Sequence, residues 1–556
     1  KLNVFVTANA GSGKTKTLID RVARLLLAGA APAQILCITY TKAAAAEMSK
    51  RVFDRLSEWV VAPPGKLETL LAALLERQPT DAERQRAREL FARTIETPGG
   101  LKVQTIHAFC ERLLQQFPLE ADVPPGFSVL DDAERRGLIA EAIERALTEA
   151  TRGRDGALSR ALAVVVPYVA EQSFETLVGE ALSKRTWLEA ASRLVLSEAE
   201  DEGAVERHYR KVLGLAPDAS DEAIEAEEAR LLADRELDRI ATTLAGGKKT
   251  DGDAAQRASA ARRAQLRSAR VTALCELLLT KDGEPRSRLM TKDLAAANPD
   301  VLDLLTRAQG RLLALAEQRR VLALADASAA LTRIADRVMQ HYVDAKRCRA
   351  SLDFDDLIRR TASLLATESG GIGAPMASWI HYKLDGRIEH ILVDEAQDTS
   401  PVQWELIEGL ADEFFSGEGA HGEREWAIFA VGDEKQSIYS FQGAAPAEFR
   451  RLGDKLAGRA RDAGLPWRRV PLTLSFRTVE PVLAAVDRVF APGAARLGLA
   501  EAAETVRHLA SRAGQAGLVE VWPTEAVAPS GDVDIWSPHE EGTSAAPVER
   551  PSARIA

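Results

Sequence analysis

The sequence has few cysteines and no long apolar run, and both scarcities restrict the class of protein. Its 556 residues include only 4 cysteines, which are widely spaced and form no C-x-x-C pair. This disfavours a disulfide framework or a zinc finger and suits a reducing compartment. The most apolar stretch, residues 161–170, contains Pro167 and is much shorter than the roughly 20 residues that span a bilayer. We therefore expect a cytoplasmic protein with no membrane partner.

Basic charge is also scarce, since 72 Lys and Arg stand against 82 Asp and Glu, for a net charge of −10. This sum does not exclude a nucleic-acid partner, because the local field governs recognition. Residues 1–120 carry 17 basic and 12 acidic side chains, residues 121–340 carry 32 and 37, and residues 519–556 carry 2 and 7. The first segment is therefore basic, and the rest of the chain hides this in the sum.

Strand and helix patterns alternate at both ends of the chain, which predicts an α/β fold with a parallel sheet. The expected strands cover residues 2–7, 35–40, 101–105, 388–393 and 426–431, with later strands from 471 and over 518–522. The main expected helices cover residues 14–27, 42–59, 106–117 and 480–490. From about 118 to 350, Leu/Ala and Arg/Glu recur at helical spacing, which predicts an inserted all-helical domain. After it, Asp353, Asp355 and Asp356 are interpreted as the start of a helix rather than as a metal site.

A P-loop pattern follows the first expected strand. It consists of Ala8, Asn9, Ala10, Gly11, Ser12, Gly13, Lys14 and Thr15. Its glycines let backbone N–H groups face phosphates, and the N-terminus of the next helix favours their negative charge. Lys14 would reach the β- and γ-phosphates of ATP, and Thr15 would hold Mg²⁺. A chance glycine-rich turn is the alternative, which the strand–loop–helix context disfavours.

Two carboxylates, Asp394 and Glu395, follow a later apolar strand. Ligands bind at the carboxyl ends of strands in an open α/β sheet. Asp394 is predicted to bind Mg²⁺, directly or through water, and Glu395 to position and deprotonate the attacking water. Their distance in sequence from Lys14 predicts an insertion between strands of one ATPase core.

These two segments resemble those of UvrD/Rep-type superfamily 1 DNA helicases. Residues 38–48, 105–110, 431–444 and 472–478 resemble further segments of that family. The segments D-E-A-Q-D-T-S and Q-S-I-Y-S-F-Q-G-A are most similar to those of the AddA-type helicase–nuclease subunit of double-strand-break repair.

The resemblance implies a RecA-like P-loop NTPase core with a large all-helical insertion and the beginning of a second RecA-like domain. The first motor domain would comprise residues 1–117 and 351–445, and the insertion residues 118–350. The second domain would begin at residues 446–522, and residues 523–556 would form a linker-like tail.

The resemblance also assigns site residues. Gln436 would sense the γ-phosphate, and Arg477 would contact it as an arginine finger in cis. Phe476 would pack near the adenine, Gln397 would couple nucleotide state to neighbouring segments, and Tyr439 would pack between the ATP and DNA sites.

The implied DNA contacts are aromatic and polar. Tyr40 and Phe441 would stack on bases, which tolerates any sequence. Thr41, Lys42 and His107 would contact the DNA backbone or sugar. Core packing is the alternative for each aromatic side chain. Gln442 stands where many members of the family have arginine, which puts any coupling through that arginine in doubt.

The implied activity is that of an ATP-dependent 3′-to-5′ DNA helicase and single-stranded DNA translocase. It would use ATP and Mg²⁺, act on single-stranded and duplex DNA, pair with a second, AddB-like helicase–nuclease subunit, and work at the bacterial nucleoid. The alternatives are a single-chain UvrD/Rep/PcrA-like helicase without a nuclease and an inactive DNA-binding scaffold. We expect the chain to be part of a longer polypeptide, with any nuclease beyond Ala556, and residues 1–556 alone to hydrolyse ATP poorly.

Overall fold

The computed structural model describes residues 2–153, 156–169, 171–197, 203–366, 380, 383, 388–415, 426–437, 445–496 and 507–522. These residues belong to two compact units. Unit 1 combines residues 1–104, 385–404 and 411–556, and unit 2 combines residues 105–384 and 405–410. The chain therefore leaves the first unit and returns to it, as expected for an insertion.

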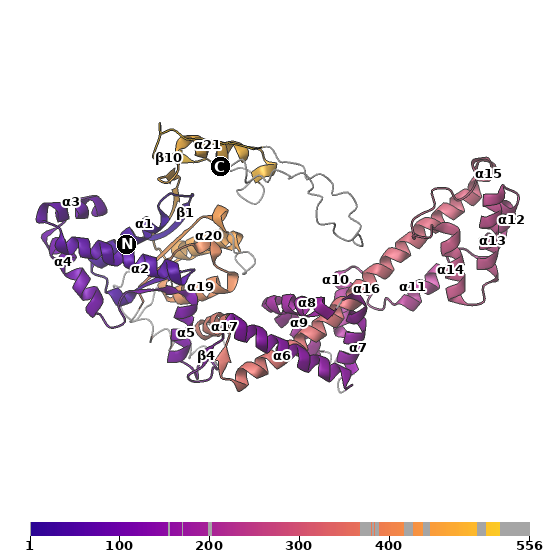
Figure 1. The fold of residues 1–556 in the computed structure, drawn as a ribbon, viewed down its shortest axis with the longest axis horizontal. Helices are drawn as coiled ribbons and strands as arrows, with labels where there is room; N and C mark the ends of the chain where they lie inside the picture. Colours follow the sequence, from indigo (N-terminus) through magenta and orange to yellow (C-terminus); the bar gives the residue numbers. More distant parts are fainter. Residues whose placement is uncertain are drawn as a thin grey trace, which may run out of the picture. The chain divides into compact units, whose positions relative to one another are not determined.

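Unit 1 is built on a six-stranded sheet with the order β3-β2-β6-β7-β1-β8 (Figure 1). Its strands are β1 (Asn3–Ala8), β2 (Ile35–Thr39), β3 (Lys102–Thr105), β6 (His390–Val393), β7 (Ala427–Gly432) and β8 (Trp467–Leu472). The pairings β2–β6, β6–β7, β7–β1 and β1–β8 are parallel. Strands β2, β6 and β7 are buried along their whole length, which is typical of a sheet covered on both faces. The predicted α/β class is confirmed.

The helices of this part of the chain begin and end close to the expected positions. They are α1 (Lys14–Ala28), α2 (Lys42–Val61), α3 (Pro64–Leu75), α4 (Asp81–Glu96), α19 (Pro401–Phe415), α20 (Pro446–Asp462) and α21 (Glu480–Val489). Helix α1 buries Leu18, Val22 and Leu26 in one apolar core with Phe429 and Val431 of β7. The central strands and α1 thus hold each other in place, which fixes the loop between β1 and α1.

The sheet continues beyond residue 445, where we expected the first motor domain to end. Strand β8 pairs with the whole of β1, from Asn3 opposite Trp467 to Ala8 opposite Leu472. In α20, Phe449 stacks on Phe5 of β1, with 4.3 Å between ring centroids. The structure therefore differs from a second domain that begins at residue 446, because the apolar side chains of residues 446–472 cover β1.

After β8, the described part of the chain contains α21 and the two-residue strands β9 (Leu474–Ser475) and β10 (Leu509–Ala510), which pair in parallel. The expected strand at residues 518–522 is not formed. Its Leu518 and Val521 are 77% and 90% exposed. An alternating apolar segment becomes a strand only beside a pairing partner, and this one has none among the described residues.

Unit 2 is helical apart from one short parallel pair, β4 (Ser128–Val129) with β5 (Ser351–Leu352). Its helices are α5 (Ile106–Gln116), α6 (Asp132–Thr151), α7 (Gly156–Val165), α8 (Glu171–Ser183), α9 (Arg185–Ser197), α10 (Ala204–Val212), α11 (Asp221–Glu228), α12 (Asp234–Ala245), α13 (Lys249–Arg263), α14 (Arg267–Leu278), α15 (Lys292–Ala297), α16 (Pro299–Cys348) and α17 (Phe354–Leu365). The predicted helical insertion is confirmed.

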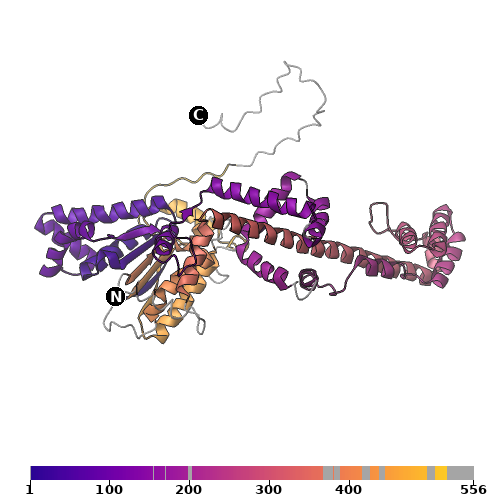
Figure 2. The same cartoon turned by 90° about the horizontal axis from the view of Figure 1, so that it is seen from below.

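The 50-residue helix α16 supports two separate apolar cores in unit 2 (Figures 1 and 2). Near its N-terminus, Leu305 and Leu312 pack with α12, α13 and α14. Near its C-terminus, Val338 and Tyr342 pack with α6, α7, α8 and α9. The long helix is therefore stable because both of its halves bury an apolar face, and not through its own propensity alone.

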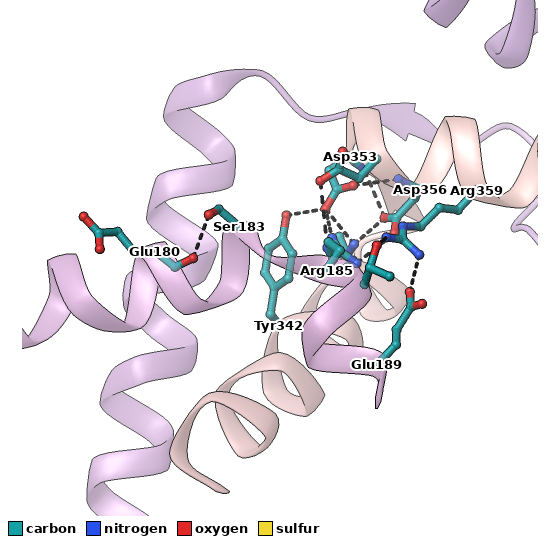
Figure 3. Close-up of polar contacts among 11 residues, drawn as sticks. Glu180, Ser183, Arg185, Glu189, Tyr342, Asp353, Asp356 and Arg359 are labelled. Atoms are coloured by element: carbon teal, nitrogen blue, oxygen red, sulfur yellow. Dashed lines mark hydrogen bonds and ion pairs between the residues drawn. The ribbon is translucent and has the colours of Figure 1, made fainter. Parts of the chain in front are cut away.

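Asp353 connects three helices of unit 2 (Figure 3). It caps α17, since its Oδ1 accepts a hydrogen bond from Asp356 N at 2.8 Å. Its Oδ2 accepts from Arg185 of α9 at 2.7 Å, and from Tyr342 and Lys346 of α16 at 2.8 and 2.9 Å. Burial opposes the charge of Asp353, but Arg185 and Lys346 outweigh it and hold its pKa below the ordinary value. The predicted cap is confirmed, and the ion pairs add a link that the sequence did not reveal.

Within the described residues, no single helix is long and apolar enough to cross a membrane. One bent helix pair, residues 156–168 with 173–183, meets the criteria of length and composition. Its Leu158, Val165 and Val178 lie in the apolar core around α16.

Candidate functional site

The candidate residues of unit 1 lie at the carboxyl ends of neighbouring parallel strands. The P-loop follows β1, Asp394 and Glu395 follow β6, and Asp433 follows β7. On the other side of β1, β8 is followed by Ser475, Phe476 and Arg477. The carboxyl ends of parallel strands meet at one edge of a sheet, where ligands bind. The fold therefore brings together residues from the two ends of the chain.

The backbone of the P-loop has a shape that depends on glycine. Gly11 and Gly13 have φ angles of 72° and 84°, in the left-handed region. A Cβ on Gly11 would lie 2.7 Å from the Cβ of Arg477 and 2.9 Å from Ser475 Oγ. Gly11 O also accepts a hydrogen bond from Phe476 N at 2.8 Å. The loop is thus held closely against the segment after β8.

The P-loop fits a phosphate group. The buried Oγ of Ser12 has no hydrogen-bond partner among the described residues. Gly13 is the N-cap of α1 and makes no side-chain cap, so the first N–H groups of this helix remain available to an anion. The ring of Phe476 would be 3.8 Å from a Cβ on Gly13, so an aromatic side chain lies beside the loop.

Gly11→Ala is expected to weaken nucleotide binding by about tenfold or more. The left-handed conformation costs an alanine roughly 1–2 kcal/mol, and the new methyl group would push the loop away from Arg477. Gly65→Ala is the matched control, since a Cβ there has nothing within 4 Å and its φ is not positive. Titration with a fluorescent ATP analogue measures both affinities. Unchanged binding by Gly11→Ala would show that the loop does not hold the nucleotide.

The two groups predicted to act on phosphate and water are in contact in this structure. Lys14 Nζ lies 2.8 Å from Glu395 Oε2, with the side chains 10% and 36% exposed. Glu395 has φ 48° and ψ 45°, a left-handed conformation that is uncommon for a residue with a side chain. Such strain is found at functional sites, where the surrounding structure imposes it. This backbone conformation could not be read from the sequence.

Asp394 fits a cation-binding role. Its side chain is buried, and its N–H donates to Ile38 O of β2 at 2.9 Å. Burial, and then the charge of Glu395, raise the pKa of Asp394 to about 6. A divalent cation favours the ionised form of such a carboxylate. Thr15, the second residue of α1, is half-buried and carries the hydroxyl that would complete an oxygen-ligand set with Asp394.

Gln397 joins the acidic pair to the segment after β7. Its Nε2 donates to Glu395 Oε2 at 2.8 Å and to Asp398 Oδ2 at 3.2 Å. Its Oε1 accepts from Asp433 N at 2.8 Å. In turn, Asp433 Oδ2 accepts from Gln436 Nε2 at 2.6 Å. The structure therefore connects Gln397 and Gln436 through Asp433, a residue that our sequence reasoning did not single out.

The candidate DNA contacts are divided between the two units. Tyr40, Thr41 and Lys42 follow β2 in unit 1. Thr41 Oγ1 caps α2 by accepting from Ala44 N at 3.1 Å, and Lys42 is exposed. Thr41 therefore has a structural role already, whereas the charge of Lys42 faces solvent.

His107 belongs to unit 2. It lies in the first turn of α5, with its ring 5.1 Å from that of Phe354. Burial lowers the pKa of His107, against the opposing charge of Asp355. Its imidazole is therefore neutral at neutral pH, and a contact with DNA would be a hydrogen bond rather than an ion pair. Tyr439, Phe441 and Gln442 lie outside the described residues.

A glycine-rich loop after a central parallel strand, with an acidic pair on a neighbouring strand, defines a P-loop nucleotide-binding protein with a RecA-like core. The sequence agrees with one family of this class: the UvrD/REP helicase N-terminal domain matches residues 1–457. The chain therefore belongs to the UvrD/Rep helicase family.

Several bacterial ATP-dependent helicase/nuclease subunits of the AddA type are similar to this chain. That of Lysinibacillus sphaericus (strain C3-41) is 25% identical over 523 residues, which is 88% of this chain and 38% of the relative. That of Desulforudis audaxviator (strain MP104C) is 29% identical over 533 residues, 91% of this chain and 40% of the relative. The chain thus spans about two fifths of the length of these relatives.

Proposed function

We propose that this chain is the motor part of an ATP-dependent 3′-to-5′ DNA helicase and single-stranded DNA translocase. It would act in double-strand-break repair within a helicase–nuclease of the AddA type. The observation that supports this most directly is the contact between Lys14 and Glu395, which places the P-loop and the acidic pair in one site. The named relatives support the repair role and an AddB-like partner.

Lys14 and Glu395 would change partners during the reaction. Lys14 would leave Glu395 for the β- and γ-phosphates of ATP. The Glu395 carboxylate would then be free to accept a proton from the attacking water, while Gln397 continues to hold it through Nε2. Asp394 and Thr15 would hold Mg²⁺, which when bound neutralises charge on the phosphates.

Two further side chains would complete the site. Arg477, whose Cβ lies against Gly11, would donate hydrogen bonds to the γ-phosphate. Gln436 would contact the same phosphate, and Phe476 would pack near the adenine. Because Arg477 follows β8 and Gln436 follows β7, a nucleotide between them would feel both sides of the P-loop strand. Relative movement of these segments would drive Tyr40, Lys42, Phe441 and the remaining DNA contacts along the strand.

The rate of ATP hydrolysis with and without single-stranded DNA tests this function in the full-length product of the gene. We expect Mg²⁺-dependent hydrolysis that increases when DNA is added. DNA binding without hydrolysis would instead favour the scaffold alternative. A nuclease activity that depends on the same polypeptide would separate the AddA type from a single-chain UvrD/Rep/PcrA-like helicase.

A further inference from the structure

A buried carboxylate to which the reaction assigns no chemical step lies beside Gln436. Asp433 follows β7 and is 1% exposed. Its Oδ2 accepts a hydrogen bond from Gln436 Nε2 at 2.6 Å, and its Oδ1 accepts from Lys435 N at 3.2 Å. An ionised carboxylate only accepts hydrogen bonds, so Gln436 must present its NH₂ group to Asp433. The remaining N–H and the carbonyl oxygen of this amide are left for other partners.

Gln436 needs such a partner to keep one orientation. It is exposed and lies in the short 3₁₀ turn η4 (Glu434–Gln436). A long, exposed side chain samples many rotamers, and fixing it has an entropic cost. The contact with the buried carboxylate removes most of this freedom before a nucleotide binds.

Asp433 is itself fixed by the acidic pair through Gln397. Asp433 N can only donate a hydrogen bond, so the atom 2.8 Å away must be the carbonyl oxygen of Gln397. The NH₂ group of Gln397 then faces Glu395. A Cβ on Gly432 would lie 2.9 Å from Gln397 Oε1, so this approach requires glycine before Asp433.

These contacts form one continuous path from the P-loop to Gln436. The path runs through Lys14, Glu395, Gln397, Asp433 and Gln436, with donor–acceptor distances between 2.6 and 2.8 Å. We propose that Asp433 is a positioning residue that fixes the amide of Gln436 for ATP hydrolysis and transmits the state of Glu395 to it. This inference rests on the proposed function of the same site.

Asp433→Asn tests the inference in the full-length protein. An asparagine cannot accept hydrogen bonds from both Gln436 and Lys435 N, because one side of its amide is a donor. We expect kcat for DNA-stimulated ATP hydrolysis to fall about 10–100-fold, with the KM for ATP changed less than about twofold. Glu434→Gln is the matched control, since this neighbour pairs with Arg450 at 2.6 Å instead. It should stay within about twofold of the original kcat.

A double-mutant cycle with Gln436→Ala separates positioning from a general structural role. If Asp433 acts through Gln436, Asp433→Asn should change kcat by less than about twofold once Gln436 is alanine. An equal loss in both backgrounds would overturn the inference. Asp433→Ser, whose hydroxyl is too short to reach Gln436, replaces the asparagine variant if that variant does not fold, and the same pattern is expected. If the unmodified protein hydrolyses no ATP, the proposed function fails; if it does and the cycle is additive, only the role of Asp433 fails.

Discussion

Glu395→Gln is expected to lower DNA-stimulated ATP hydrolysis by about 10²–10⁴-fold, the usual contribution of a general base. The amide keeps the size of the side chain but cannot take a proton from water. Nucleotide affinity should be equal or higher, because Lys14 loses the carboxylate that it contacts at 2.8 Å in the structure. Steady-state hydrolysis and titration with a fluorescent ATP analogue measure the two effects separately.

Glu405→Gln is the matched control for this prediction, since Glu405 is exposed on α19. It should leave both hydrolysis and binding unchanged. A Glu395→Gln protein that hydrolyses ATP at the original rate would contradict the assigned role. A protein that has lost nucleotide binding as well would show that Glu395 is needed for the shape of the site rather than for the chemical step.

Asp353→Asn is expected to destabilise unit 2 by about 3 kcal/mol, near the lower end of the cost of breaking a buried ion pair. Lys346 and Arg185 have side chains only 4% and 13% exposed, and both would lose their contact with Asp353 Oδ2. The nearby carboxylate of Asp356 keeps part of this charge compensated. Urea unfolding and hydrogen exchange in α9, α16 and α17 measure the effect.

The matched control is Asp355→Asn in the same turn of α17. Asp355 is 48% exposed and lies 3.9 Å from Arg185, and such a pair contributes at most about 1 kcal/mol. Equal unfolding curves for the two variants would contradict the role given to Asp353.

The contribution of Asp353 should also depend on pH. Its pKa is lowered in the folded state, so the stabilisation is complete above its unfolded pKa, near 4, and is lost as the pH falls below that value. The difference in unfolding free energy between the original protein and Asp353→Asn should therefore shrink below about pH 4. A difference that stays constant into more acidic solution would contradict the ion-pair account.

Local chemistry explains why much of the site could be predicted. The glycines of the P-loop and the N-cap at Asp353 are read from a few adjacent residues, because backbone conformation and capping depend on near neighbours. The apolar run before Asp394 likewise requires a buried strand. Strand order then brings Lys14 and Glu395 to one sheet edge, as their positions after β1 and β6 implied.

Long-range contacts explain what the sequence did not reveal. Strand β8 joins the sheet because it pairs with β1, a choice that depends on the surface left open beside Phe5. The links from Gln397 to Asp433 and from Asp353 to Arg185 join residues far apart in sequence. No local pattern specifies such hydrogen bonds, since each side chain would be equally acceptable on a solvated surface.

Strand separation on tailed DNA duplexes tests the central claim most directly. The full-length protein, supplied with ATP and Mg²⁺, should separate a duplex that carries a 3′ single-stranded tail and should leave one with a 5′ tail largely intact. Glu395→Gln should separate neither. Unwinding from the 5′ tail alone would contradict the proposed polarity, and unwinding that persists in Glu395→Gln would contradict the claim that this site drives the movement.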